Sequence, residues 1–322
     1  MAPGHPGGRS RGGGQVGTDP GTGRRWRPGY PVDLGRTLFP LRRGPADPAF
    51  RTTPDGAFWR ASLTPAGPGT LRLRADARLG EIEALAFGPG ADWLLDRFPD
   101  LLGAADDPAA LDLPPGPLRE AQRGHPGLRL TRTGLVMESL VPAILEQKVT
   151  TDEAYRAWRT LLRDFGTPAP GPVEGMRVAP TARGWAMIPS WEWHRAGVDP
   201  KRSATVVRAA RLAPRLEEAS AMAPEEAFAR LTAVPGIGVW TAAETLQRAS
   251  GDPDAVSVGD FHLPNLVGWA LAGRPRSDDA QMLDLLDPYR PQRHRVCRLI
   301  GLTGARAPRF GPRLTPNDHR RR

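Results

Sequence analysis

A short glycine-containing turn between two helical segments has the residue types that bind phosphate. The stretch from Pro235 to Gly238 reads Pro-Gly-Ile-Gly, and apolar residues at helical spacing flank it on both sides. Gly236 and Gly238 permit positive φ and carry no Cβ that would block a close approach. Backbone N–H groups of such a turn, and of the helix that follows, can point at a phosphate. We expect Ile237 to face inward; the alternative is that the segment is only a tight helix–helix turn.

An aspartate stands 22 residues after the second glycine, at Asp260. It directly precedes a helix expected over 261–272, where aspartate is a common N-cap. A helix N-terminus also favours the ionised carboxylate, so capping and chemistry are compatible. Such a carboxylate can stabilise a developing positive charge or activate a water molecule. Two residues later, His262 could orient a water or touch a phosphate; the alternative is a structural histidine.

The composition is that of a soluble, globular and strongly basic protein. The chain has 322 residues, enough for two domains with hydrophobic cores, and a formal net charge of +9. This charge is typical of nucleic-acid binders. The alternative is coding bias, since nearly all basic residues are arginine and the lysines are Lys148 and Lys201. No apolar stretch reaches the ~18–20 residues of a membrane helix, and none resembles a secretory signal. We therefore expect a cytoplasmic, nucleoid-associated protein without membrane contact.

A single cysteine, Cys297, limits the chemistry that the chain can perform. It excludes disulfides within the chain, and also any four-cysteine zinc or iron–sulfur site. The simplest interpretation of Cys297 is a buried, inert thiol.

Four regions are expected along the chain. Their predicted ranges are a disordered arm over 1–25, a mixed α/β domain over 26–130, a helical domain over 131–304 and a basic tail over 305–322. In the arm, glycine, proline and arginine dominate, and such a composition cannot bury enough apolar surface to order the chain. In the α/β domain, alternating residues predict strands over 58–63 and 70–75, and a helix follows over 91–102. Helical spacings in the third region cover 139–162, 200–216, 224–231, 261–272 and 293–302.

The pattern over 231–243, with Asp260 at its distance from the turn, resembles the helix-hairpin-helix DNA glycosylase superfamily. The resemblance extends upstream to 126–130 and 143–150, and it covers roughly residues 125–303. The 3-methyladenine DNA glycosylases II are the most similar members. The resemblance implies an α+β protein, in which a small TATA-binding-protein-like α/β domain precedes an all-α helix-hairpin-helix core.

Roles for individual residues also follow from this resemblance. Asp260 is implied to be catalytic, and Gly236, Gly238 and Thr241 to bind the DNA backbone. Gln147 and Lys148 are implied to contact DNA, because the residue after this glutamine wedges into the space left by the flipped nucleotide. For Lys148 the alternatives are a phosphate contact, with Gln147 or Val149 sharing the wedge role, or a solvated charge.

The base pocket is expected to contain Trp240 and Glu244. Family members that also cleave the DNA backbone have a lysine at the position of Trp240, which forms a Schiff base with the sugar, so this chain is expected to be monofunctional. Aromatic residues line the pocket of the alkylpurine enzymes, but Glu244 and Gly301 stand where two of them are expected. Glu244 could face solvent or recognise an amino group of the base.

Three tryptophans could compensate for the missing aromatic residues of the pocket. They are Trp185, Trp191 and Trp193. They could form a replacement wall; the alternative is a cluster in the core or on the surface.

The expected function is that of a monofunctional DNA glycosylase of base excision repair. Its substrate would be 3-methyladenine-type alkylated purines, flipped out of damaged double-stranded DNA. The alternatives are another lesion (hypoxanthine, uracil or an oxidised purine) and a non-catalytic module that binds damaged DNA. No organic cofactor is implied, and a monomer is expected. As in relatives, the carbonyl groups of Thr232, Val234 and Ile237 could hold a monovalent cation.

Overall fold

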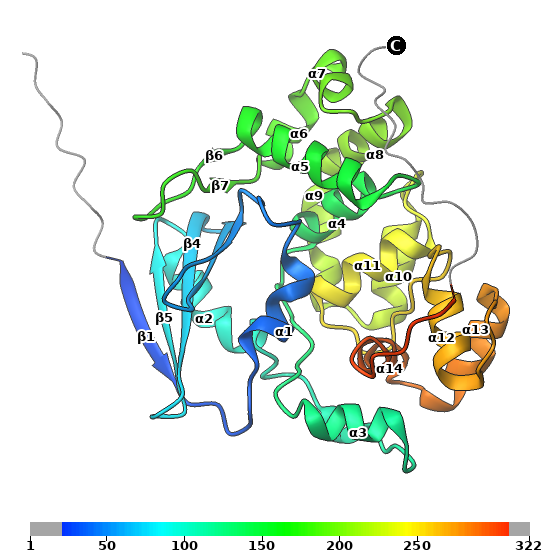
Figure 1. The fold of residues 1–322 in the computed structure, drawn as a ribbon. Coiled ribbons are helices and arrows are strands. Elements are labelled where there is room, and N and C mark those ends of the chain that lie inside the picture. Colours follow the sequence, from blue (N-terminus) through cyan, green and yellow to red (C-terminus); the bar gives the residue numbers. More distant parts are fainter. Residues whose placement is uncertain (1–20, 309–322) are drawn as a thin grey trace, which may run out of the picture.

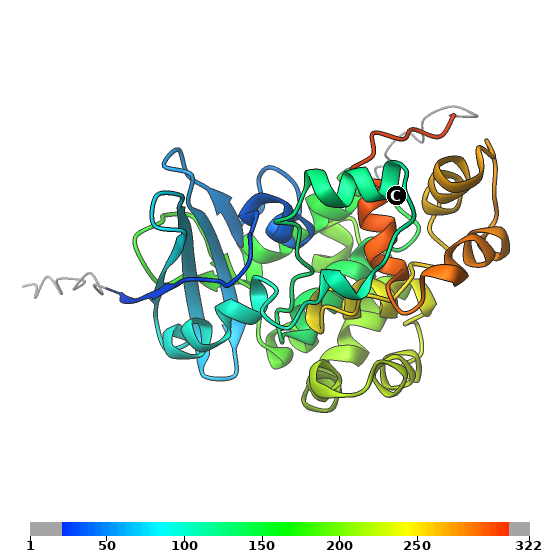
Figure 2. The same cartoon turned by 90° about the horizontal axis from the view of Figure 1, so that it is seen from below.

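The computed structural model describes residues 21–308. Residues 1–20 of the expected arm and residues 309–322 of the expected tail lie outside the described residues. An antiparallel sheet forms one end of the molecule, and α12 (Leu263–Ala272) and α13 (Asp279–Leu286) form the opposite end (Figure 1). The view from below shows the same separation (Figure 2). A small sheet followed by a helical core confirms the expected α+β fold. In residues 21–308 no helix is both long enough and apolar enough to cross a membrane.

The sheet has five strands in the order β1-β5-β4-β3-β2, with every neighbouring pair antiparallel. Their bounds are β1 Thr22–Trp26, β2 Phe50–Thr52, β3 Phe58–Thr64, β4 Gly67–Asp76 and β5 Glu81–Phe87. Strands β3 and β4 confirm the predicted pair. Alternation places Leu71 and Ile82 under helix α2 (Ala91–Leu101), while Trp59 and Phe87 face the short strand β7 (Arg177–Val178).

The prediction of disorder up to residue 25 is wrong at its end, because β1 begins at Thr22. This strand pairs with β5, with Trp26 opposite Ile82. An arginine of the strand, Arg24, donates from Nη1 to the Leu95 carbonyl of α2 at 2.8 Å. Backbone pairing and a long-range arginine contact therefore order a segment that has few apolar side chains of its own.

The helical part surrounds α4, which is buried on almost every side and packs against α5, α8 and α11. The bounds of the remaining elements are α1 Leu34–Leu38, α3 Pro117–Gly124, α4 Val136–Leu145, α5 Thr151–Phe165, β6 Thr167–Pro168, α6 Ala182–Met187, α7 Ser190–Arg195, α8 Pro200–Arg211, α9 Ala213–Glu217, α10 Pro224–Thr232, α11 Val239–Ala249 and α14 Arg293–Ile300. The helical spacing over 139–162 thus belongs to two helices. They separate because Thr150 and Glu153 form a capping box that starts α5.

The predicted domain boundary at residue 130 does not coincide with the packing of the chain. Leu111, Leu113 and Leu128 belong to a hydrophobic cluster with Val267 and Leu299 of the C-terminal helices. Residues before 130 therefore contribute to the helical core, because this stretch is apolar enough to cover α12 and α14.

The tryptophan cluster is part of the core, as one of the two sequence interpretations stated. The rings of Trp158, Trp185 and Trp193 stack in a row, with centroids 6.4 Å and 5.9 Å apart. Both Trp185 and Trp193 are buried, whereas Trp191 is exposed.

Candidate active site

The glycine turn joins α10 to α11 and has one conformationally required glycine. Gly236 has φ +98°, and a Cβ at this position would lie 2.2 Å from the Thr205 hydroxyl oxygen on α8. Ile237 is buried, as expected, and its N–H donates to the Val234 carbonyl at 3.0 Å. Gly236 is therefore needed for the backbone to pass directly over α8.

The second glycine, Gly238, meets no such constraint from the fold. Its φ of −91° is accessible to any residue. A Cβ there would have no atom within 4 Å, so it would project into open space in front of α11. The first N–H groups of a helix lack partners within the helix. A bare Gly238 therefore leaves the N-terminus of α11 open to an approaching anion.

Gln147 ties the loop after α4 to this turn. Its Nε2 donates to the Gly236 carbonyl at 3.0 Å and to the Thr241 hydroxyl at 2.8 Å. Thr241 is 2% exposed. The prediction that Thr241 contacts DNA is wrong for its side chain, because the side chain points into the protein and fixes Gln147.

Lys148, next in sequence, is exposed and has φ +54°. Among residues 21–308 it is the one non-glycine residue with positive φ. An unbranched side chain in the left-handed region costs about 1–2 kcal/mol. Such strain persists where the surroundings impose it, often at functional sites.

Asp260 lies just before α12 and bonds both to the start of that helix and to Trp240. Its Oδ1 accepts the backbone N–H groups of His262 and Leu263, each at 2.8 Å. Trp240 Nε1 donates to the other carboxylate oxygen, Oδ2, at 3.3 Å. Asp260 is partly buried, and both of its carboxylate oxygens accept hydrogen bonds. The contact with the start of α12 agrees with the expected position of Asp260 before a helix, and the bond to Trp240 is a further contact that the sequence did not indicate.

One face of α11 holds the segment that leads to Asp260. Gln247 Nε2 donates to the Ser257 hydroxyl at 2.9 Å, and that hydroxyl donates to Glu244 Oε1 at 2.5 Å. Trp240 bonds to Asp260 itself. Trp240, Glu244 and Gln247 stand at positions i, i+4 and i+7 of α11, which share one face of the helix. The helix that begins at the glycine turn thus also fixes the distance from the turn to the carboxylate.

Comparisons with known proteins agree with this arrangement at the level of the fold. No family model matches the chain, and no curated protein is significantly similar in sequence. A solved 3-methyladenine DNA glycosylase from Archaeoglobus fulgidus superposes with a TM-score of 0.71 at 18% identity, over 87% of this chain and 98% of that one. The chain has the helix-hairpin-helix DNA glycosylase fold.

Two further structures with this glycosylase fold are similar over most of their length. MBOgg1, solved with a low-affinity DNA ligand, has a TM-score of 0.69 at 16% identity, over 88% of this chain and 96% of that one. The 8-oxoguanine glycosylase/lyase from Clostridium acetobutylicum has a TM-score of 0.67 at 11% identity, over 85% and 94%.

Within this glycosylase fold Glu244 lies inside the protein, so the alternative that it faces solvent is wrong. Its carboxylate forms an ion pair with Arg248 at 2.7 Å, and both side chains are largely buried. Burial acts to raise the pKa of Glu244, but Arg248 and the Ser257 hydrogen bond outweigh it and hold the pKa below its ordinary value. Arg248 also donates from Nε to the Pro40 carbonyl at 2.9 Å. The pair therefore joins α11 to the N-terminal part of the chain.

Phe261 is an exposed aromatic residue that the sequence analysis did not single out. It follows Asp260 directly and is 75% exposed. Its ring contacts that of His262 edge to face, with the centroids 4.9 Å apart. The one signal in the sequence was the position of Phe261 next to Asp260. Its exposure could not be predicted, because Phe261 also fits a core position of the expected helix.

Cys297 lies on α14, partly buried. Desolvation raises the pKa of its thiol to about 12. A thiol with this pKa stays protonated near neutral pH, in agreement with the expected inert role.

Proposed function

We propose that this chain is a monofunctional DNA glycosylase with Asp260 as its catalytic residue. One observation carries the proposal: the Asp260 carboxylate is fixed by the N-terminus of α12 and by Trp240. Trp240 belongs to the helix that the glycine turn begins. Helix α11 thus links the turn that is proposed to bind the DNA backbone to the carboxylate that is proposed to act on the sugar.

In the proposed mechanism, the turn binds a backbone phosphate at the N-terminus of α11. The damaged nucleotide flips out of the duplex, which costs a few kcal/mol. Asp260 stabilises the positive charge that develops on the deoxyribose as the bond to the base breaks. It also takes a proton from the water that attacks the sugar. The products are the free base and an abasic site in an intact strand, because Trp240 has no amine that could form a Schiff base.

We also propose that carbonyl groups of the turn hold a monovalent cation. Thr232 ends α10, and Val234 and Ile237 follow within the turn. A helix C-terminus carries partial negative charge, and carbonyl oxygens are suitable ligands for a hard cation. The cation would stiffen the turn; the chemistry of base release does not pass through it.

For the substrate we propose alkylated purines of the 3-methyladenine type in double-stranded DNA. The Trp240 ring beside Asp260 supports this choice, because an aromatic ring attracts an electron-poor, cationic base. The fold similarity to the Archaeoglobus fulgidus enzyme is in agreement. A second candidate is a neutral, oxidised or deaminated base. The fold similarity to the Clostridium acetobutylicum 8-oxoguanine glycosylase/lyase supports this candidate.

A panel of duplex oligonucleotides tests the proposal. Each would carry a single 3-methyladenine analogue, hypoxanthine, uracil or 8-oxoguanine. We expect base release from the alkylated purine, with strands that break only after alkali treatment. Strand cleavage without alkali would contradict the monofunctional assignment. Preference for hypoxanthine or 8-oxoguanine would favour the second candidate.

Replacement of Lys148 by glycine separates backbone strain from contact with DNA. Glycine accepts φ +54° without strain but loses more chain entropy on folding. We therefore expect the free energy of unfolding to change by no more than about 1 kcal/mol. Base release from duplex DNA should fall, because the side chain that enters or flanks the duplex is gone. Urea unfolding measures the first effect and single-turnover kinetics the second. An unchanged rate of base release would show that the Lys148 side chain has no role in binding or flipping DNA.

A further inference from the structure

The loop that presents Lys148 is held from three directions. On the side of α8, Arg202 donates from Nη1 to the Leu145 carbonyl at 2.6 Å. On the side of the glycine turn, Gln147 bonds to the Gly236 carbonyl. The third contact comes from the N-terminal part of the chain, where Arg43 Nη1 lies 3.0 Å from Glu146 Oε1. These contacts fix consecutive residues directly before the exposed, left-handed Lys148.

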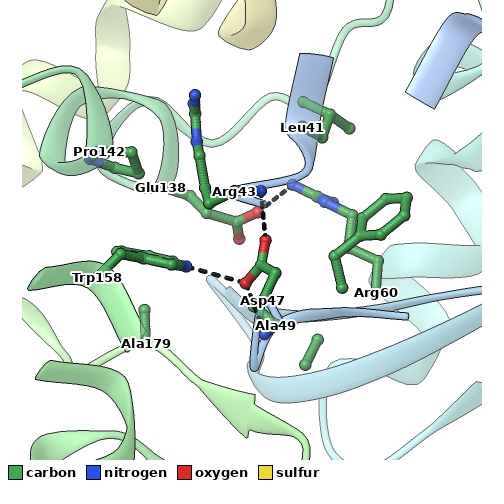
Figure 3. Close-up of a pocket in the computed structure, with 11 residues that line it drawn as sticks. Leu41, Arg43, Asp47, Ala49, Arg60, Glu138, Pro142, Trp158 and Ala179 are labelled. Atoms are coloured by element: carbon green, nitrogen blue, oxygen red, sulfur yellow. Dashed lines mark hydrogen bonds and ion pairs between the residues drawn. The ribbon is translucent and has the colours of Figure 1, made fainter. Parts of the chain in front are cut away.

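The Arg43–Glu146 ion pair is well shielded from water. The two side chains are 7% and 18% exposed. Arg43 is itself fixed, because its backbone N–H donates to Asp47 Oδ2 at 2.7 Å. The other oxygen of Asp47 accepts from Trp158 Nε1 at 2.9 Å. Figure 3 shows Asp47 between Arg43 and Trp158, in the layer where the N-terminal segment meets α4 and α5.

We infer that Arg43 is a positioning residue for base flipping: through Glu146 it holds the Lys148 loop in the position from which Lys148 enters the duplex. The inference rests on the proposed function. Arg43, which is buried, then takes part in flipping without contacting DNA itself. A loop that inserts into a base stack needs such support, because displacement by about 1 Å from the productive geometry can cost 10²-fold in rate.

The same layer contains a second ion pair that serves as a matched control. Arg60 of β3 pairs with Glu138 of α4, and their side chains are 9% and 19% exposed. This pair also joins the N-terminal part to α4 (Figure 3). Glu138 stands in the first turn of α4, whereas Glu146 follows the last one. The two pairs are therefore alike in chemistry and burial, and only Arg43–Glu146 adjoins the loop.

The experiment compares two double variants, Arg43→Met with Glu146→Met, and Arg60→Met with Glu138→Met. Replacement of both partners avoids leaving a buried charge unpaired. The first readout needs no catalysis: 2-aminopurine fluorescence beside an abasic-site analogue in a duplex, which rises when a side chain unstacks the neighbouring base. We expect the wild type and the Arg60/Glu138 variant to raise the fluorescence, and the Arg43/Glu146 variant to lose most of the rise.

The second readout is the rate of base release from one lesion in duplex and in single-stranded DNA. The Arg43/Glu146 variant should lose about tenfold or more on the duplex and less than about twofold on the single strand, where nothing has to be unstacked. The control variant should stay within about twofold on both. Equal behaviour of the two variants in the fluorescence assay would overturn the inference.

Two additions keep the outcome interpretable. If either double methionine variant unfolds at a much lower urea concentration than the wild type, the single variants Glu146→Gln and Glu138→Gln replace the double variants. The glutamine amide oxygen can still accept a hydrogen bond from arginine. Glu146→Gln should then recover part of the fluorescence rise. If the wild type releases no base at all, the proposed function fails, and the fluorescence comparison alone decides on Arg43.

Discussion

Replacement of Asp260 by asparagine should lower the rate of base release by about 10²–10⁴-fold while the fold and DNA affinity stay intact. Asparagine is as good an N-cap as aspartate. Its amide oxygen can still accept the N–H groups of His262 and Leu263 that Oδ1 accepts now. The amide is neutral, however, and can neither balance a positive charge on the sugar nor take a proton from water. Single-turnover kinetics and fluorescence anisotropy measure the two properties.

A control at Trp240 tests whether the indole only orients the carboxylate. Trp240→Phe keeps an aromatic ring and removes the Nε1 donor that lies 3.3 Å from Asp260 Oδ2. Its effect should be much smaller than that of Asp260→Asn, because the charge of the carboxylate remains. A wild-type rate in Asp260→Asn would exclude Asp260 as the catalytic group.

Replacement of Gly236 by alanine should destabilise the protein by about 2–5 kcal/mol, combining backbone strain and overpacking. The residue has φ +98°, and the added Cβ would collide with the Thr205 side chain, whose hydroxyl is bonded to the Lys201 carbonyl. The turn would have to move off α8, and its N–H groups would lose their common direction. The free energy of unfolding, measured in urea, and the affinity for duplex DNA should therefore both fall.

The neighbouring glycine provides the matched control for this prediction. Gly238→Ala should leave the free energy of unfolding nearly unchanged, because its φ is ordinary and a Cβ there meets open space. If a phosphate lies against the turn, the same methyl group should still weaken binding to duplex DNA. Unaltered affinity in Gly238→Ala would show that no phosphate approaches this glycine closely.

The elements with local sequence signals could be predicted. The alternation over 58–63 and 70–75 correctly predicted strands, since burial on one face of a sheet imposes a period of two residues. The glycine turn with a buried Ile237 was also visible, because the flanking helices and the need for Gly236 are local properties. The position of Asp260 just before a helix belongs to the same class.

What could not be predicted depends on partners far apart in the sequence. Glu244 appears in sequence as a misplaced charge. Its neighbour Arg248 is visible in the sequence, but the bonds of this pair to Ser257 and to the Pro40 carbonyl are not. From the sequence, Thr241 is a candidate for DNA contact. In the structure its hydroxyl accepts a hydrogen bond from Gln147, which is distant in sequence. Such pairs leave no periodic pattern that a single sequence could show.

The structure shows that part of the positive net charge is not available at the surface. Several arginines are buried in internal contacts and cannot meet DNA. Arg202 bonds to the Leu145 carbonyl, Arg248 to Glu244, and Arg295 is paired with Asp106. Net charge therefore overstates the basic surface that is available to a phosphate backbone, and the exposed loop and turn carry more weight in the argument for DNA.

Release of free base from damaged DNA tests the central claim most directly. Genomic DNA treated separately with methylating, nitrosating and oxidising agents would be incubated with wild type and with Asp260→Asn, and the released bases identified by mass spectrometry. We expect wild type to release a modified purine, foremost from methylated DNA, and to leave alkali-labile sites; Asp260→Asn should release almost none. Duplex binding by the wild type without release of any base from the three DNAs would contradict the account.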